Sequence, residues 1–123
     1  MTITAADAQN ISQQHHLKLI LLHGSVLSGQ THAQSDIDLA VLPEKNQDLN
    51  ILDLFNSLAK LGYSNTDIVN LDTANPLLLK TITDRAQILA GKKEDLDKLQ
   101  LKALHLYNDY LPYLKLEKQY VTN

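Results

Sequence analysis

The sequence predicts an α/β (α+β) fold, in which a small mixed β-sheet is flanked by helices and a helical segment follows at about 93–121. Three observations lead to this prediction. Short apolar runs of strand length alternate with longer stretches in which apolar residues recur at helical spacing. The length of 123 residues is enough to bury one hydrophobic core. No internal repeat, low-complexity tract or linker divides the chain, so we expect a single domain of residues 1–123.

A helix and two strands are predicted in the first third of the chain. Thr4 followed by Asp7 is typical of a capping box at a helix start, and a weak apolar stripe follows it. The run LKLILL at 17–22 predicts a short buried strand, and IDLAVL at 37–42 predicts a second strand that ends at Pro43. Glycine, serine and threonine are frequent between the two runs, which indicates a loop.

A second helix and a third strand follow. We expect Asn46 or Asp48 to cap a helix whose apolar residues recur at helical spacing over 49–61, with Gly62 at its C-cap. The run TDIVNL at 66–71 predicts the third strand. Strands that alternate with helices in this way are typical of a sheet layered with helices.

The last third of the chain is predicted to be mainly helical. Asn75 and Pro76 suit the N-cap and the first position of a helix. The end of this helix stays open, because QILAG at 87–91 fits either its continuation or a fourth short strand. A further helical pattern covers about 93–121, and we expect a break at Pro112 because proline lacks a backbone N–H.

Composition and charge exclude several classes of partner. A formal net charge of −3 at pH 7 provides no broad attraction to nucleic acid. No apolar run approaches the length of a membrane span, and the first residues lack a basic start followed by an apolar core. We therefore expect a cytoplasmic protein without a membrane or nucleic-acid partner. The absence of cysteine excludes disulfides and thiolate metal sites.

Two aspartates open the predicted strand at 37–42. Because side chains alternate across a strand, Asp36 and Asp38 share one face, while the apolar residues between and after them face the core. Two like charges held together repel, and a divalent cation between them makes the arrangement favourable. Carboxylate oxygens are ligands that Mg²⁺ prefers. The pair therefore indicates part of a magnesium site, although aspartates at a strand start are often only solvated end residues.

Gly24 and Ser25, directly after the first predicted strand, are candidates for a phosphate-binding turn. Gly24 lets the backbone approach an anion, Ser25 offers a hydroxyl, and a helical turn starting here would direct free N–H groups at a phosphate. The segment GSVLSGQT at 24–31 nearly fits a P-loop, but Gln30 stands where that motif needs lysine. We therefore favour a phosphate-binding turn beside the aspartates over a P-loop.

The Gly24-Ser25 pair, ten further residues and the pair Asp36 and Asp38 form the pattern G-S-x10-D-x-D. In this pattern the sequence resembles the DNA polymerase β-like nucleotidyltransferase superfamily. In its short length and the form SDIDLAVL it resembles the minimal nucleotidyltransferases, the antitoxin partners of HEPN-domain toxins. The resemblance in element order covers most of residues 10–100 and implies the nucleotidyltransferase fold.

The resemblance also implies a site and a reaction. Two Mg²⁺ ions would be held by three catalytic carboxylates, namely Asp36, Asp38 and a third on a later strand. Asp67 in TDIVNL matches that third position best, and Asp72 is a weaker candidate. The glycine-serine pair would bind ATP. The implied reaction transfers AMP to a hydroxyl, which in the antitoxins is a tyrosine of the HEPN toxin, so that the modified toxin no longer cleaves RNA.

One departure from the family pattern leaves alternatives open. Many relatives carry an arginine just after the glycine-serine pair, whereas this sequence has Val26 and no Lys or Arg before Asp36. Lys18, Lys45 or the partner would then have to supply the positive charge. The main alternative is a non-catalytic antitoxin that masks its toxin by binding. Adenylylation of a small molecule is a third interpretation, for which the C-terminal segment is short.

The histidines and tyrosines give weaker signals. The five histidines form no cluster with metal-ligand spacing, so we expect solvated or core side chains. Four of the five tyrosines lie in the last 17 residues, which fits core packing and a protein interface equally well. These four are Tyr107, Tyr110, Tyr113 and Tyr120.

Overall fold

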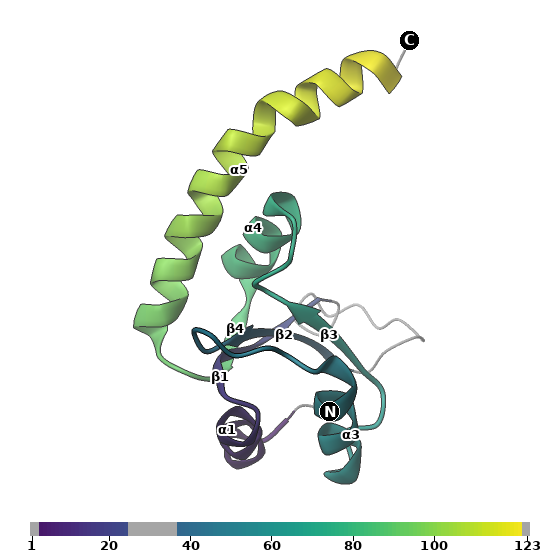
Figure 1. Ribbon diagram of the computed structural model, residues 1–123, viewed down its shortest axis with the longest axis vertical. Helices are drawn as coiled ribbons and strands as arrows, with labels where there is room; N and C mark the ends of the chain where they lie inside the picture. Colours follow the sequence, from purple (N-terminus) through teal and green to yellow (C-terminus); the bar gives the residue numbers. More distant parts are fainter. Residues whose placement is uncertain (1–2, 25–36, 122–123) are drawn as a thin grey trace.

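The structure is a computed structural model that describes residues 3–24 and 37–121, without the side chains of 117–121. Within these residues, one sheet of four strands has two helices on each face (Figure 1). The elements in chain order are α1 (Ala5–Gln14), β1 (Leu17–His23), β2 (Ile37–Pro43), α3 (Ile51–Lys60), β3 (Thr66–Asn70), α4 (Pro76–Arg85), β4 (Gln87–Ala90) and α5 (Lys93–Val121).

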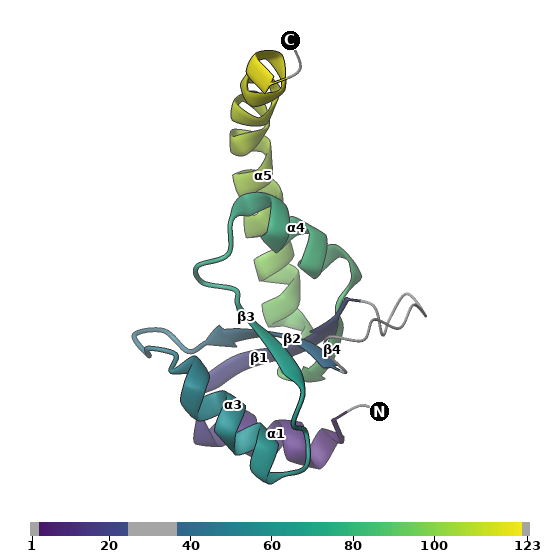
Figure 2. The same cartoon turned by 90° about the vertical axis from the view of Figure 1, so that its right-hand side faces the viewer.

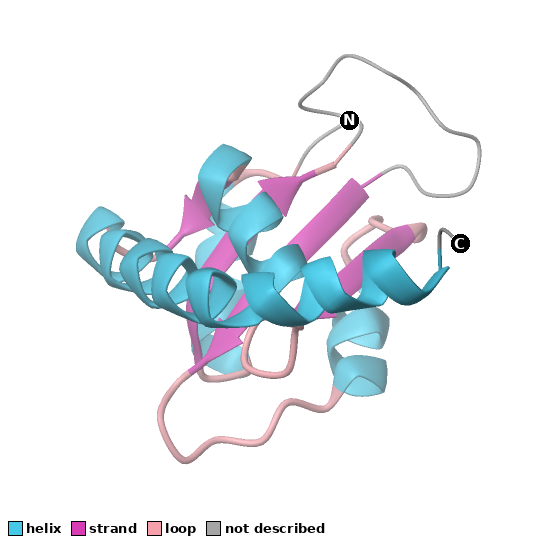
Figure 3. Cartoon of the chain, turned by 90° about the horizontal axis from the view of Figure 1, so that it is seen from above, coloured by secondary structure: helices cyan, strands magenta, loops and turns pink. Residues whose placement is uncertain are grey.

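The sheet is mixed, as predicted, with the strand order β3-β2-β1-β4. β1 runs antiparallel to both β2 and β4, whereas β2 runs parallel to β3. A parallel pair needs a crossover, and here the crossover contains α3. Figure 3 shows the strands from above, with α5 lying across them. The two middle strands, β1 and β2, therefore have neighbours on both sides.

Residue alternation in β1 divides the core into two layers. Ile20 and Leu22 pack with residues of α1 and α3, whereas Leu19 and Leu21 pack with residues of α4 and α5. All four side chains are at most 3% exposed. Figure 2 shows the two pairs of helices on opposite faces of the sheet. Because both faces of β1 are covered, the strand reads as a continuous apolar run rather than an alternating one.

The start of α1 confirms the predicted cap and adds a partner to it. The Thr4 side chain accepts a hydrogen bond from the Asp7 N–H (3.2 Å). The Tyr63 hydroxyl donates to the Asp7 carboxylate (2.7 Å) and accepts from the Thr4 N–H (3.3 Å). Tyr63, which follows α3, therefore links that part of the chain to the first turn of α1.

The second predicted helix begins later than expected. Its N-cap is Asn50, whose side chain accepts a hydrogen bond from the Asp53 N–H (3.1 Å), so the prediction of Asn46 or Asp48 was wrong. Asn46 lies instead in the turn after β2 with a φ of 65°. Asparagine tolerates this left-handed conformation better than most residues do. The local turn therefore uses the residue that we expected to cap the helix.

The last third of the chain settles one open question and corrects one expectation. Residues 87–91 do not continue the preceding helix, because α4 ends at Arg85 and Gln87–Ala90 forms β4. The break expected at Pro112 was wrong, since α5 continues through it. Pro112 is exposed, so water can solvate the carbonyl group that lacks an N–H partner there. The ribbon of α5 curves in this region (Figure 1).

α5 extends well beyond the rest of the molecule (Figure 2). Among its described side chains, those that it buries against α4 and the sheet lie in its first half, and Ala103 is the last of them. Farther along, the Lys80 Nζ atom of α4 lies 5.3 Å from the centre of the Tyr107 ring, and Tyr113 is 67% exposed. The Tyr120 side chain lies outside the described residues. In the part of the chain that the structure describes, no helix is long and apolar enough to cross a membrane.

Candidate active site

Three side chains from adjacent strands form a row at one end of the sheet. Asp38 of β2 is the register partner of His23 in β1 and of Asp67 in β3. Directly paired residues on neighbouring strands project from the same face of a sheet. Two residues farther along, Leu21 and Ala40 pack against α4 and α5, so the row lies on that face.

The alternation in β2 confirms the prediction for 37–42. Ile37 and Leu39 are each 1% exposed and pack in the core beside α1 and α3. Asp38 therefore points to the opposite face, where its side chain is partly buried. Asp36 and Ser25 lie outside the described residues, so their places in the site stay predictions.

Gly24 turns the chain directly over Asp38. Its φ of 84° lies in the left-handed region, and a Cβ atom placed there would stand 2.2 Å from the Asp38 Oδ2 atom. Glycine avoids both the steric clash and the strain of this conformation. Gly24 was predicted to let the backbone approach a phosphate, and the neighbour that the structure shows beside it is Asp38, a proposed metal ligand. Binding of a phosphate at this turn remains a prediction.

The two candidates for the third carboxylate lie at opposite ends of β3. Asp67 is exposed and pairs with Asp38. Asp72 follows the far end of the strand, where its N–H donates a hydrogen bond to the Asn70 side chain (2.9 Å). Five residues of strand span about 16 Å. Asp67 is therefore the candidate that can share a metal ion with Asp38.

His23 belongs to the row but was not singled out from the sequence. Its Nε2 atom is buried and has no hydrogen-bond partner among the described residues. The only signal in the sequence was its position directly before Gly24. His23 lies opposite Asp38 because of the register between β1 and β2, and the spacing of residues in the sequence does not reveal that register.

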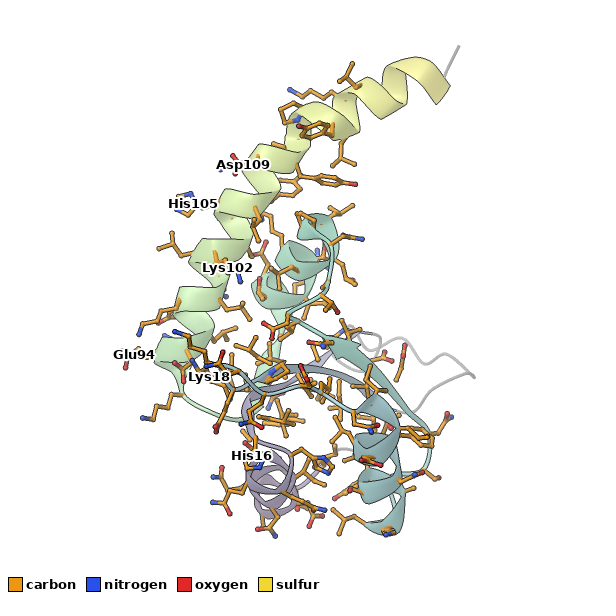
Figure 4. All side chains as sticks on the ribbon, in the orientation of Figure 1. His16, Lys18, Glu94, Lys102, His105 and Asp109 are labelled. Carbon is orange, nitrogen blue, oxygen red and sulfur yellow. The ribbon has the colours of Figure 1, made fainter. Side chains whose placement is uncertain are left out.

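The lysines that we considered for phosphate binding lie at the other end of the sheet. Lys18 is next to Leu17, which pairs with Pro43, and Lys45 follows β2. Both lysines line a cavity of about 640 Å³. Lys18 lies beside the first turn of α5 (Figure 4), and Asp95 of that turn lines the same cavity. Since Lys18 and His23 are five strand residues apart, about 16 Å separates them, and the lysines do not supply charge to the row.

The described residues alone do not complete a metal site. Within residues 3–24 and 37–121, no group of three or more histidine, aspartate or glutamate side chains could hold a metal ion. Asp38 and Asp67 supply two neighbouring carboxylates. The predicted third ligand, Asp36, immediately precedes β2. A complete site of three carboxylates therefore depends on a residue just outside the described range.

Comparison with known proteins assigns the family. The family described as "Polymerase beta, Nucleotidyltransferase" matches residues 7–95. This chain belongs to that nucleotidyltransferase family. The matched range of the nucleotidyltransferase includes the whole row and Gly24, so it confirms the resemblance inferred from the G-S-x10-D-x-D pattern.

Individual relatives of this nucleotidyltransferase are toxin–antitoxin proteins. It is 33% identical over 105 residues to the protein adenylyltransferase MntA of Shewanella oneidensis, covering 84% of this chain and 72% of that protein. A crystal structure of a toxin–antitoxin with AMP-PNP matches with a TM-score of 0.74 and 28% identity over 98% of this chain and 96% of that chain. A structure of the tri-AMPylated HEPN toxin of Shewanella oneidensis in complex with MNT antitoxin matches with a TM-score of 0.68 and 26% identity, covering 96% of this chain and 92% of that chain. These matches confirm the predicted nucleotidyltransferase fold.

Proposed function

We propose that this nucleotidyltransferase is a cytoplasmic antitoxin that transfers AMP from ATP to a tyrosine of a cognate HEPN-domain ribonuclease toxin and thereby neutralises it. The observation that carries the proposal is the 33% identity to a protein adenylyltransferase across 84% of the chain. The relatives solved with AMP-PNP and with a tri-AMPylated HEPN toxin support ATP as the substrate and a toxin as the acceptor.

We assign the binding of two Mg²⁺ ions to Asp36, Asp38 and Asp67. The fit rests on two observations. Asp38 and Asp67 are register partners. The Gly24 backbone lies so close to the Asp38 carboxylate that a side chain at position 24 would not fit. Carboxylate oxygens are hard ligands, and a divalent cation offsets their mutual repulsion. Bound Mg²⁺ would lower the pKa of the attacking hydroxyl and neutralise charge on the leaving pyrophosphate.

The residues of the chain then have distinct tasks. Gly24 and Ser25 hold the triphosphate through backbone N–H groups and a hydroxyl. Asp67 is exposed, so it can position the acceptor tyrosine and accept its proton. The tyrosine oxygen forms a bond to the α-phosphorus while the bond from that phosphorus to the bridging oxygen breaks, and pyrophosphate leaves.

Arg85 is the residue that we propose as the source of the positive charge that residues 25–36 lack. Residues 25–36 contain no Lys or Arg, and Arg85 is the only arginine of the sequence. Gln87 of β4 pairs with Leu22 of β1 in an antiparallel register. Arg85 is the last residue of α4, two residues before Gln87, so it lies near the end of β1 that Gly24 follows. A guanidinium at this position can bind two phosphate oxygens at once.

Mass spectrometry of the toxin tests the proposal. The HEPN toxin from the same organism is incubated with ATP, Mg²⁺ and a small amount of the nucleotidyltransferase, and an AMP adduct on a tyrosine peptide is expected. Asp38→Asn should give no adduct, whereas the matched variant Asp72→Asn should modify the toxin at the wild-type rate. Absence of adduct with the wild-type protein, or full modification by Asp38→Asn, would contradict the proposal.

A second candidate function is neutralisation by binding alone. The observation that favours it is Val26 and the absence of Lys and Arg from residues 25–36, since weak triphosphate binding would leave the site without turnover. Under this alternative the toxin is recovered unmodified from cells that the wild-type antitoxin protects.

A further inference from the structure

The buried nitrogen of His23 has no part in the reaction described above. The Nε2 atom is buried and makes no hydrogen bond within the described residues. Removing a polar atom from water without giving it a partner costs free energy. Buried polar atoms without partners are few in native proteins, and each calls for a physical explanation. The protein therefore keeps an unfavourable atom beside its proposed site.

The position of His23 indicates which group this nitrogen serves. Its register partner is Asp38, and the next residue, Gly24, turns over the same carboxylate. Leu21, two residues earlier on the same face, is fully buried, so the core behind the imidazole ring is already filled. His23 and Gly24 therefore flank Asp38 from the end of one strand.

We propose that His23 is a positioning residue for Asp38: its Nε2–H donates a hydrogen bond to the Asp38 carboxylate when Mg²⁺ and ATP draw that carboxylate into its ligating orientation. This inference rests on the proposed function. A carboxylate that is itself hydrogen-bonded keeps its orientation toward a metal ion. Without ligand the nitrogen has no partner among the described residues, and in the complex it gains the hydrogen bond to Asp38.

Two substitutions separate the nitrogen from the ring that carries it. His23→Phe keeps a planar ring and removes the nitrogen, whereas His23→Gln keeps an N–H donor at a comparable reach. The matched control is His105→Phe, which changes an exposed histidine on the side of α5 that faces away from α4 (Figure 4). Each protein is measured in two ways: the melting temperature without ligand, and the affinity for AMP-PNP with Mg²⁺ by titration calorimetry.

The proposal predicts opposite effects on the free and the bound protein. His23→Phe should melt at the same or a higher temperature than the wild type, because a buried atom without a partner has been removed. Its affinity for AMP-PNP with Mg²⁺ should fall about 10- to 100-fold. His23→Gln should lose less than about 10-fold in affinity, because its donor can still reach the carboxylate. His105→Phe should change neither quantity.

The alternatives give different results. Unchanged affinity in His23→Phe would overturn the proposal, and so would an equal loss of affinity in His23→Phe and His23→Gln, because the donor would then not be the property that matters. A wild-type protein that fails to bind AMP-PNP with Mg²⁺ would overturn the proposed function and this inference together. A wild-type protein that binds normally beside an unaffected His23→Phe variant would overturn this inference alone.

Discussion

Gly24 and Asp38 lie so close together that a Cβ atom on Gly24 would stand 2.2 Å from the Oδ2 atom and 3.0 Å from the Cβ atom of Asp38. The carboxylate is therefore confined by the turn after β1 as well as by its own strand. A side chain at position 24 would have to displace the Asp38 carboxylate. A substitution at Gly24 should therefore impair activity as well as stability, whereas a substitution at a glycine far from Asp38 should affect stability alone.

Gly24→Ala should abolish AMP transfer and lower the free energy of unfolding by more than about 1–2 kcal/mol, because the clash with Asp38 adds to the cost of a left-handed conformation for an L-residue. The matched control is Gly62→Ala, where φ is 98° and a Cβ would meet no atom within 4 Å. It should lower the free energy of unfolding by about 1–2 kcal/mol, through the strained conformation alone, and leave transfer intact. Urea denaturation and mass spectrometry of the toxin measure the two quantities. Equal transfer by both variants would contradict the role of Gly24.

The faces of single strands could be predicted from the sequence, but the pairing between strands could not. Alternation places Asp38 opposite to Ile37 within one strand, because local spacing decides it. That Asp38 meets both His23 and Asp67 depends on a register between segments far apart in the sequence. Asp67 could be predicted as a site residue from the resemblance to a family, whereas no signal in the sequence predicted that His23 lies beside Asp38.

The errors at helix ends have a similar cause. Asn46 and Asn50 are both good caps, and which one is used depends on the turn that follows β2. Pro112 is a strong local signal for a break, yet a long exposed helix tolerates it because water can solvate the freed carbonyl group. Competing local signals of this kind are decided by the surroundings in the fold.

Asp67→Asn should slow AMP transfer by at least about 100-fold, because it removes a proposed metal ligand and the proposed acceptor of the tyrosine proton. Asp72→Asn, at the other end of β3, should transfer AMP at the wild-type rate. Single-turnover rates at saturating ATP and toxin measure the effect. A loss in Asp72→Asn with full activity in Asp67→Asn would move the third carboxylate to Asp72.

Arg85→Ala should weaken the binding of AMP-PNP by roughly 10- to 100-fold, because a charge-assisted hydrogen bond contributes about 1.5–3 kcal/mol. Arg85→Lys should recover part of that loss, since it keeps the charge but not the paired donors. Lys18→Ala removes a positive charge at the opposite end of the sheet and should leave affinity unchanged. Titration calorimetry with Mg²⁺ gives all three affinities. An effect in Lys18→Ala alone would refute the assignment of Arg85.

The double variant Asp36→Asn, Asp38→Asn should fail to protect cells from the toxin, although it still binds the toxin. Catalysis needs the carboxylates, whereas masking needs only a contact surface. Calorimetry with purified toxin provides the control, because a lost complex would also remove protection. Wild-type antitoxin should protect when it is less abundant than the toxin, since each molecule can modify many toxins. Equal protection by the double variant would favour neutralisation by binding alone.

Acid should destabilise the protein partly through His15. Burial lowers the pKa of His15 from its ordinary value of 6.5, an effect that Asp53 opposes and His16 reinforces, and its Nε2 atom lies 2.9 Å from the Ser57 Oγ atom. The unfolded chain therefore takes up the proton first, so this contribution to stability is present above pH 6.5 and is lost as the pH falls below it. His15→Gln should show a smaller loss between pH 6.5 and 5 in urea denaturation than the wild type. His105→Gln, exposed on α5, should behave as the wild type does.

The parallel pairing of β2 with β3 also determines at what stage of synthesis and folding the site can form. A chain made from its N-terminus presents Gly24 and Asp38 before Asp67 has been synthesised, and β3 can align with β2 only after the crossover through α3 is complete. A nascent chain that ends before β3 therefore carries part of the site without the ability to transfer AMP. In a cell that makes toxin and antitoxin together, a newly made antitoxin becomes active only after its whole sheet has been synthesised and folded. During that delay, newly made toxin meets no active antitoxin from the same round of synthesis.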